Sequence, residues 1–325
     1  MDKIAILIPC YNEALTIRKV VEDAKHFCPE AVVYVYDNNS TDETVKEALA
    51  AGAIVRYEPM QGKGNVVRRM FREVDAECYV MVDGDDTYGL ETLPQMVKSV
   101  LEDHVDMMIG DRLSGAYYTQ NKRPFHNFGN DLVRHSINRL FHSHVKDIMT
   151  GYRAFSYEFV KTFPVLSKGF EIETEMTIHA VEKNLLVRSM TITYRDRPKG
   201  SYSKLHTFRD GMKVISKIFG MYRKYRPLAY YCGWFVIFAA LGIGFIIPVF
   251  ITYFQTGEVP NYPTLIACCF SLLTALLCLF FGFQNERAHQ NDRIEFERAF
   301  VTANDEKKAK LREKQPEMHS KSQKD

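Results

Sequence analysis

Two long segments without a charged side chain limit what this chain can fold into more than any other feature. Residues 227–257 contain no Asp, Glu, Lys or Arg over 31 positions, and after Glu258 the same holds for the 27 residues 259–285. Each segment exceeds the roughly 20 helical residues that cross the hydrocarbon core of a bilayer. We therefore expect two transmembrane helices, over about 230–254 and 262–283. The alternative, a helical hairpin buried in a soluble protein, fits poorly because charge-free helices of this length are rare there.

The charges that flank these segments predict their orientation. The linker 255–261 contains no Lys or Arg, whereas residues 213–226 hold five basic side chains and no acidic one. Three arginines follow the second segment within residues 286–298. Because basic flanks stay on the cytoplasmic side, we expect both termini, and everything before the first segment, to lie in the cytoplasm.

Two further segments border the apolar ones. Between 207 and 227, apolar and basic residues alternate at helical spacing, which favours an amphipathic helix on an anionic membrane surface; a soluble helix packed on the preceding domain is the alternative. Residues 285–325 are highly charged, and we expect a helix there that frays towards its end and carries no chemistry. The predicted divisions are a domain at 1–206, a juxtamembrane segment at 207–227, two transmembrane helices at 228–284 and a charged cytoplasmic tail at 285–325.

Composition excludes several classes of protein. The 42 Lys and Arg residues outnumber the 40 Asp and Glu residues by only 2, so we expect no nucleic-acid partner. Hydrophobic residues make up 46% of the chain and aromatic residues 13%, which suffices for a core and argues against disorder. The seven cysteines form no Cys-x-x-Cys pair, and we interpret them as reduced thiols that act as small apolar side chains.

The first 200 residues alternate between strand and helix patterns. Apolar runs predict strands at 4–8, 32–36, 54–57, 79–82 and 105–109, and helical patterns lie between them, for example at 14–27, 42–51 and 91–102. Such alternation predicts an α/β domain with a mostly parallel sheet covered on both faces. Ligands of such sheets bind beyond the carboxyl ends of the strands. The chain has no G-x-G-x-x-G after its first strand and no Walker A pattern, which argues against dinucleotide dehydrogenases and P-loop enzymes.

Acidic residues follow the predicted strands at several places. The most informative are Asp83 and Asp85, which come directly after an apolar run. Two carboxylates at a strand end can hold a hard divalent cation and leave positions for diphosphate oxygens. The alternative is an Asx turn that caps the next helix. Glu171, Glu173 and Glu175 leave a similar choice open, between a site and the acidic first turn of a helix.

Five motifs together carry a resemblance to a known family. In chain order they are Pro9-Cys-Tyr-Asn-Glu13, Asp37-Asn-Asn-Ser-Thr-Asp42, Gly62-Lys-Gly64, Asp83-Gly-Asp85 and Gly110-Asp-Arg112. The chain resembles the family 2 glycosyltransferases, whose GT-A fold is Rossmann-like. Through three later stretches, 147–153, 170–175 and 194–205, it is similar to the polyprenyl-phosphate glycosyltransferases, which include the undecaprenyl-phosphate sugar transferases and dolichyl-phosphate mannose synthase. Its two apolar segments are similar to those of the bacterial branch.

The resemblance implies roles for individual residues. The residues that would bind the nucleotide sugar are Pro9, Tyr11, Glu13, Asp37, Lys63, Asp83, Gly84 and Arg112. Asp83 and Asp85 would hold Mg²⁺ or Mn²⁺, and the residues that would act in catalysis are Asp85, Asp147, Arg197 and Lys204. Asp37 would contact the base, and here the chain departs from the family, because the common Asp-Asp-Gly is Asp37-Asn38-Asn39. We therefore expect base recognition to differ in detail.

The resemblance also implies a reaction. It is the inverting transfer of one sugar from a nucleotide sugar, with UDP-glucose or UDP-N-acetylglucosamine favoured, to undecaprenyl or another polyprenyl phosphate at the cytoplasmic face of a bacterial cell membrane. A lipid phosphate has a second pKa of about 6 and is already anionic at neutral pH, so it needs positioning more than deprotonation. Two alternatives stay open: transfer to a sugar hydroxyl of a lipid-linked glycan, and a non-catalytic membrane scaffold. A homo-oligomer is compatible with the resemblance and with the hairpin.

Overall fold

The computed structural model describes residues 1–114, 134–141, 143–169, 171–195, 220, 222–259 and 261–321, with side chains described up to Glu313. It divides into two compact units. The first comprises Met1–Thr207 together with Phe296–Asp325, and the second comprises Phe208–Glu295. Most of the predicted amphipathic segment 207–227 lies outside the described residues.

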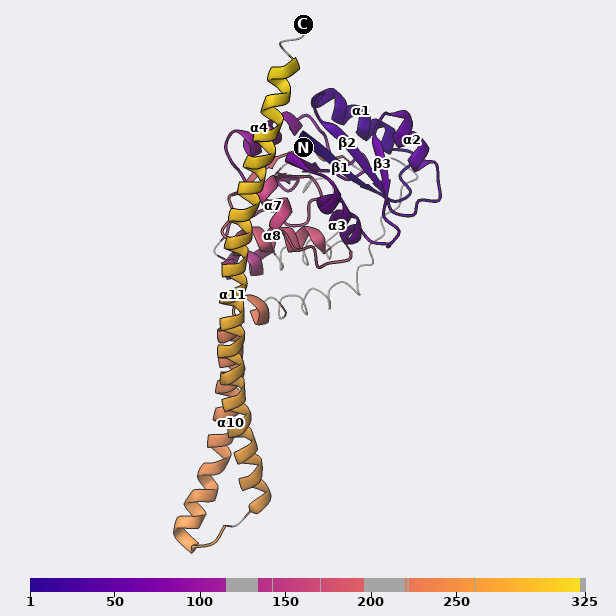
Figure 1. Ribbon diagram of the computed structural model, residues 1–325. Coiled ribbons are helices and arrows are strands. Elements are labelled where there is room, and N and C mark those ends of the chain that lie inside the picture. The colour runs from indigo at the N-terminus through magenta and orange to yellow at the C-terminus, as the bar shows by residue number, and fades with distance from the viewer. Residues whose placement is uncertain are drawn as a thin grey trace. The chain divides into compact units, whose positions relative to one another are not determined.

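The first unit is built on one seven-stranded sheet (Figure 1). Its strands are β1 (Asp2–Cys10), β2 (Val32–Asp37), β3 (Ile54–Tyr57), β4 (Ala76–Met81), β5 (Met107–Asp111), β6 (Arg153–Ser156) and β7 (Val187–Thr191). In space they follow the order β3-β2-β1-β4-β6-β5-β7. All neighbours are parallel except β6, which is antiparallel to both β4 and β5. The structure thus confirms the predicted mostly parallel α/β sheet.

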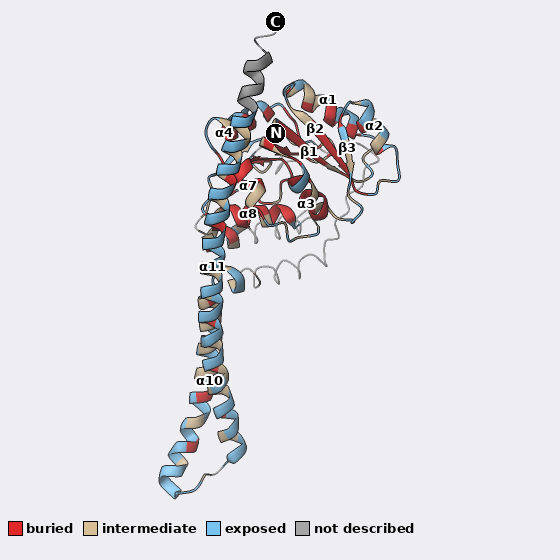
Figure 2. Cartoon of the chain, in the orientation of Figure 1, coloured by how far each residue is buried: buried red, intermediate tan, exposed pale blue. Residues whose placement is uncertain are grey.

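Helices cover both faces of this sheet. They are α1 (Ile17–Phe27), α2 (Thr44–Ala50), α3 (Lys63–Glu73), α4 (Leu93–Leu101), α7 (Tyr157–Thr162) and α8 (Ile172–Glu182). The apolar run Ile4–Ile8 of β1 is fully buried, as is usual for a central parallel strand (Figure 2). Alternate residues of β1, β2 and β4 pack with α1 and α4 on one face. On the other face, Phe71 of α3 meets Tyr79 of β4 and Phe155 of β6 edge-on or tilted.

Strands β6 and β7 are not among the strands that the sequence patterns predicted, and β6 is the harder of the two to recognise. It has only four residues, and they are all buried, including the charged Arg153. A strand this short has no measurable alternation, and a buried arginine contradicts the apolar pattern of a central strand. The expected helix at 14–27 also begins later, at Ile17, because Asn12 has a positive φ of 54° and the following residues form a loop.

The second unit contains two long apolar helices, α10 (Pro227–Thr256) and the first part of α11 (Tyr262–Lys321). Both are long and apolar enough to cross a membrane, and they coincide with the two predicted spans. Large side chains such as Phe245, Phe254 and Phe270 are exposed along them, and Figure 2 shows long exposed stretches on both helices. Apolar surface of this kind indicates association with a membrane. Gly257, with a left-handed φ of 75°, ends α10.

The last part of α11, from Phe296 onwards, belongs to the first unit. Phe296 is 7% exposed, and its ring lies edge-on to the imidazole of His179 on α8 at 5.3 Å. The ammonium of Lys183 lies 5.4 Å from the centre of the same ring. Further along α11, Ala303 is also buried. This segment is therefore packed on the domain, a contact that the charged sequence of the predicted tail did not indicate.

Two lysines of the same helix form ion pairs with the domain. Lys307 contacts both carboxylate oxygens of Glu158 on α7 at 3.1 Å, and Lys310 contacts Asp75 at 2.7 Å. Burial alone would raise the pKa of Asp75, but hydrogen bonds from Lys161 and Lys310 lower it below its ordinary value of 3.8. The tail helix is thus held by both apolar and charged contacts.

Candidate active site

The carboxyl end of β2 carries Asp37, the residue predicted to contact the base. Asp37 pairs in register with Cys10 at the end of β1 and is only 4% exposed. Its Oδ2 accepts a hydrogen bond from the N–H of Ser40 at 3.2 Å. Its Oδ1 is buried and meets no donor among the residues that the structure describes. Since an unpaired buried carboxylate oxygen is costly, Asp37 is placed to accept a hydrogen bond from a ligand.

The loop after β1 is tied to the loop after β2. The N–H of Asn12 donates to the hydroxyl of Ser40 at 2.9 Å, and the side-chain oxygen of Asn12 accepts from the N–H of Thr41 at 2.8 Å. These contacts bring the first and second motifs together at one edge of the sheet. The predicted nucleoside-binding residues of this loop are all half-buried: Pro9, Tyr11 and Glu13.

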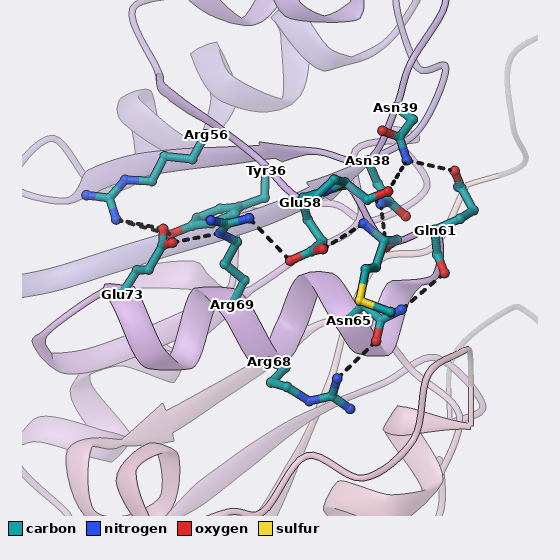
Figure 3. A network of polar contacts seen from close by, with 12 residues as sticks. Tyr36, Asn38, Asn39, Arg56, Glu58, Gln61, Asn65, Arg68, Arg69 and Glu73 are labelled. Atoms are coloured by element: carbon teal, nitrogen blue, oxygen red, sulfur yellow. Dashed lines mark hydrogen bonds and ion pairs between the residues drawn. The ribbon is translucent and has the colours of Figure 1, made fainter.

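Asn38 and Asn39 hold the segment Glu58–Gly62, which leads from β3 to α3 (Figure 3). The Nδ2 of Asn38 donates to the carbonyl oxygens of Glu58 at 2.8 Å and Met60 at 2.9 Å, and its Oδ1 accepts from the N–H of Gly62 at 2.7 Å. Asn39 has a positive φ of 64°, and its Nδ2 donates to the carbonyl oxygen at position 59 at 2.9 Å. In the sequence alone, these two asparagines stand out only as a departure from the family pattern.

A second network supports the outer side of the same segment (Figure 3). Glu73 on α3 accepts from the hydroxyl of Tyr36 at 3.0 Å, from Arg56 at 3.1 Å and from Arg69 at 2.7 Å. Arg69 also reaches Glu58 at 3.5 Å. Burial alone would raise the pKa of Glu73, but hydrogen bonds from Arg69, Tyr36 and Arg56 lower it.

Lys63, the first residue of α3, joins two distant parts of the chain. Its ammonium contacts Asp83 at 2.5 Å and Glu173 on α8 at 2.6 Å, and its side chain is only 8% exposed. Burial alone would lower the pKa of Lys63, but the charges of Asp83 and Glu173 raise it, so the ammonium stays charged. Burial raises the pKa of Glu173, and Lys63 opposes that shift. Glu173 therefore lies both in the first turn of a helix and beside the site.

Asp83 and Asp85 follow β4, next to β1 in the sheet. Asp85 is 4% exposed. Its Oδ1 accepts hydrogen bonds from the N–H of Thr87 at 3.2 Å and from the hydroxyl of Thr87 at 2.6 Å. This arrangement is an Asx turn. A Cβ on Gly84 would lie 2.7 Å from the sulfur of Cys10, so this position is restricted to glycine. Among the described residues no three His, Cys, Asp or Glu side chains cluster closely enough to hold a metal alone.

Arg112 and Asp147 form a buried, two-pronged ion pair beyond β5. The Nε and Nη2 of Arg112 contact the two oxygens of Asp147 at 2.7 and 3.0 Å, and the N–H groups of Arg112 and Met149 donate to the same carboxylate at 3.2 Å. Asp147 is fully buried. Burial alone would lower the pKa of Arg112, but its surroundings, including Asp147, raise it. In this structure the carboxylate of Asp147 thus positions Arg112.

The stretch after Asp147 passes close to Asp83. Gly151 lies so close to the carboxylate of Asp83 that no Cβ would fit, and its N–H donates to the hydroxyl of Tyr88 at 3.0 Å. Arg153 donates to the carbonyl oxygens at positions 148 and 150 at 2.6 and 3.0 Å, which fixes the shape of this stretch. Sequence patterns identified this stretch only through the family resemblance. Two other predicted site residues, Arg197 and Lys204, lie outside the described residues.

Comparison with known proteins decides the family. Residues 5–163, from β1 to the end of α7, match the family model described as glycosyl transferase family 2. The glycosyltransferase AglJ of Haloferax volcanii is 32% identical over 257 residues, which are 78% of this chain and 82% of that protein. The chain belongs to glycosyl transferase family 2. The matched residues of this family 2 glycosyltransferase include Asp37, Lys63, Asp83 and Asp147.

Three further matches are one relative and two solved structures. The dolichyl-phosphate hexose transferase of Haloferax volcanii is 26% identical over 217 residues, which are 67% of this glycosyltransferase and 92% of that protein. A crystal structure of glucosyl-3-phosphoglycerate synthase from Mycobacterium tuberculosis matches with a TM-score of 0.54 and 19% identity, over 67% of this chain and 80% of that one. A structure of the same synthase with Mn²⁺, UDP and phosphoglyceric acid matches with a TM-score of 0.52, 20% identity and coverage of 67% and 78%. These matches confirm the GT-A fold.

Proposed function

We propose that this family 2 glycosyltransferase transfers one sugar, with inversion, from a nucleotide sugar to a polyprenyl phosphate at the cytoplasmic face of a membrane. The observation that carries the donor assignment is the buried Oδ1 of Asp37, which has no partner among the described residues. A nucleobase N–H is a donor that would satisfy it. Asp37 ends β2, and β1 and then β4 follow in the sheet, so a nucleotide with its base at β2 would extend towards Asp83 and Asp85.

A divalent cation, Mg²⁺ or Mn²⁺, fits the donor set at the end of β4. Asp83 and Asp85 offer carboxylate oxygens, the ligands that these hard cations prefer. Because the described residues contain no group of three acidic, histidine or cysteine side chains arranged to hold a metal, diphosphate oxygens and water would complete the coordination. The ion would supply neutralisation of the charge on the departing diphosphate. The Mn²⁺ and UDP bound by the mycobacterial synthase support this assignment.

The remaining residues position the two anionic reactants. Lys63, held between Asp83 and Glu173, places a permanent positive charge beside the diphosphate end of the site. Arg112, held by Asp147, adds a second cation. An oxygen of the lipid phosphate would form the new bond to the anomeric carbon while the bond to the diphosphate breaks on the opposite side. The favoured donors are UDP-glucose and UDP-N-acetylglucosamine, on the family resemblance.

Two observations favour a phosphate acceptor over a sugar hydroxyl. A hydroxyl needs a general base, and the carboxylate of Asp147 is already engaged by the guanidinium of Arg112. A relative that covers two thirds of this chain is a dolichyl-phosphate hexose transferase, and the two apolar helices suit an enzyme that meets its acceptor in a membrane. Arg197 and Lys204 remain proposed contacts of the phosphates.

The test is transfer itself, with the purified full chain, undecaprenyl phosphate, Mg²⁺ and a panel of radiolabelled nucleotide sugars. We expect label from one donor to enter the organic phase, and Asp85→Asn to abolish this transfer. Asp86→Asn is the matched control, because Asp86 pairs with Lys19 and has a positive φ that asparagine tolerates. No organic-phase label from any donor, or label that survives Asp85→Asn, would contradict the proposal.

A further inference from the structure

Asn38 connects the base end of the donor site to its diphosphate end. It directly follows Asp37, whose Oδ1 is placed for the base, and its own side chain is 3% exposed. Its side-chain oxygen accepts a hydrogen bond from the N–H of Gly62, which immediately precedes Lys63. Lys63 in turn contacts Asp83. A single side chain thus links the two places where a nucleotide sugar would be bound.

The chemistry at position 38 requires an amide. Nδ2 donates two hydrogen bonds, to the carbonyl oxygens of Glu58 and Met60, and Oδ1 accepts one, from the N–H of Gly62. A carboxylate could accept from Gly62, but it cannot donate. It would leave two carbonyl oxygens without a donor and place a negative charge against them. The aspartate that family members commonly carry at this position is therefore incompatible with the Glu58–Gly62 segment as it is arranged here.

The start of α3 has little freedom to adjust to such a change. Gly62 has a φ of 131°, and a Cβ on it or on Gly64 would collide with the backbone of residues 167 and 168. The N–H of Gly64 also donates to the carbonyl oxygen of Lys168 at 3.1 Å. The first turn of α3 is therefore confined between Lys168 on one side and Asn38 on the other. A shift of the segment at Asn38 would be transmitted to Lys63.

We propose that Asn38 is a positioning residue of the donor site, which sets donor affinity by holding the Glu58–Gly62 segment and with it Lys63. Asn39 supports the same segment through its hydrogen bond at position 59. This inference rests on the proposed function, since it concerns the affinity of the same site for a nucleotide sugar.

The test compares Asn38→Asp, Asn38→Ala and Asn39→Gly in the full-length protein. Binding of UDP with Mg²⁺ is measured by calorimetry, and transfer is measured to obtain the KM of the donor and the KM of undecaprenyl phosphate separately. Asn184→Gly is the matched control for Asn39→Gly, because Asn184 also has a positive φ, of 56°. Asn184 comes before β7 and therefore lies at the amino-terminal end of a strand, whereas the proposed site lies at the carboxyl ends.

We expect Asn38→Asp to raise the dissociation constant of UDP and the KM of the donor about tenfold or more, since it removes the donor from two carbonyl groups and places a negative charge beside them. The KM of the lipid phosphate and the kcat at saturating donor should stay within about twofold. Asn39→Gly should have a smaller effect of the same kind, and Asn184→Gly none. Asn38→Ala should have an effect of the same kind, and if Asn38→Asp fails to fold, Asn38→Ala and Asn39→Gly decide.

Two failures can be told apart. If the wild-type chain binds no nucleotide and transfers no sugar, the proposed function is wrong. If it binds and transfers, but the variants at 38 and 39 keep its donor affinity, or lose affinity for donor and lipid phosphate alike, the positioning role of Asn38 is wrong.

Discussion

Replacing Asp147 by asparagine tests whether this buried carboxylate holds Arg112 in place. The variant keeps the shape of the side chain but removes the charge that faces the guanidinium at 2.7 and 3.0 Å. Breaking a buried ion pair by neutralising one partner costs about 3–5 kcal/mol. The side chain of Arg112 keeps 15% exposure, so we expect the lower end, about 3 kcal/mol. For a domain of this size that lowers the melting temperature by about 6–12 °C.

The assay is thermal unfolding of the detergent-solubilised chain, followed by circular dichroism. Asp103→Asn is the matched control, because Asp103 also pairs with an arginine, Arg188, at 3.3 Å, but both side chains are about half exposed. An exposed pair contributes about 0–1 kcal/mol, so the control should melt within about 3 °C of the wild type. Equal melting temperatures for Asp147→Asn and the wild type would refute the argument that this pair is structurally important.

Further outcomes follow from the same contacts. Asp37→Asn should weaken UDP binding about tenfold or more, measured by calorimetry, because it removes a charged acceptor of a hydrogen bond; unchanged affinity would remove the base-binding role. Lys307→Ala should destabilise the fold by about 1–3 kcal/mol, since Glu158 stays buried without its partner, whereas the exposed Lys308→Ala should have almost no effect on the melting temperature. The pKa of Asp75 lies below its ordinary value of 3.8, so the ionised carboxylate stabilises the folded state above that pH and the contribution is lost as pH falls further. The stability difference between wild type and Asp75→Asn should therefore shrink as pH falls below about 4. Removing divalent cations with EDTA should stop transfer, and Mg²⁺ or Mn²⁺ should restore it; turnover that is insensitive to chelation would exclude the proposed cation.

Local patterns predicted the parts of the fold whose signal is contained in a short stretch of sequence. The run Ile4–Ile8 is a buried central strand as expected, and Asp37 and Asp83 follow the strands that the apolar runs indicated. The two charge-free segments correspond to α10 and the start of α11. In each case periodicity or the absence of charge within about ten to thirty residues determines the element.

Contacts between distant residues were beyond these patterns. Lys63 and Glu173 are 110 positions apart, and nothing in either neighbourhood specifies that they meet. The same holds for Lys307 and Glu158, which are 149 positions apart, so the packing of the tail helix on the domain could not be predicted. The role of Asn38 is hidden for a similar reason, because its hydrogen bonds go to backbone groups whose position depends on the fold and not on their side chains.

The central claim is that the sugar ends on a lipid phosphate, and the linkage in the product tests it most directly. The product that the full chain makes from undecaprenyl phosphate and its preferred donor is extracted and examined by ³¹P and ¹H NMR spectroscopy. We expect one phosphodiester signal coupled to an anomeric proton whose configuration is opposite to that of the donor, and release of the free sugar by mild acid. A phosphomonoester signal together with a sugar in an acid-stable glycosidic linkage would contradict the account.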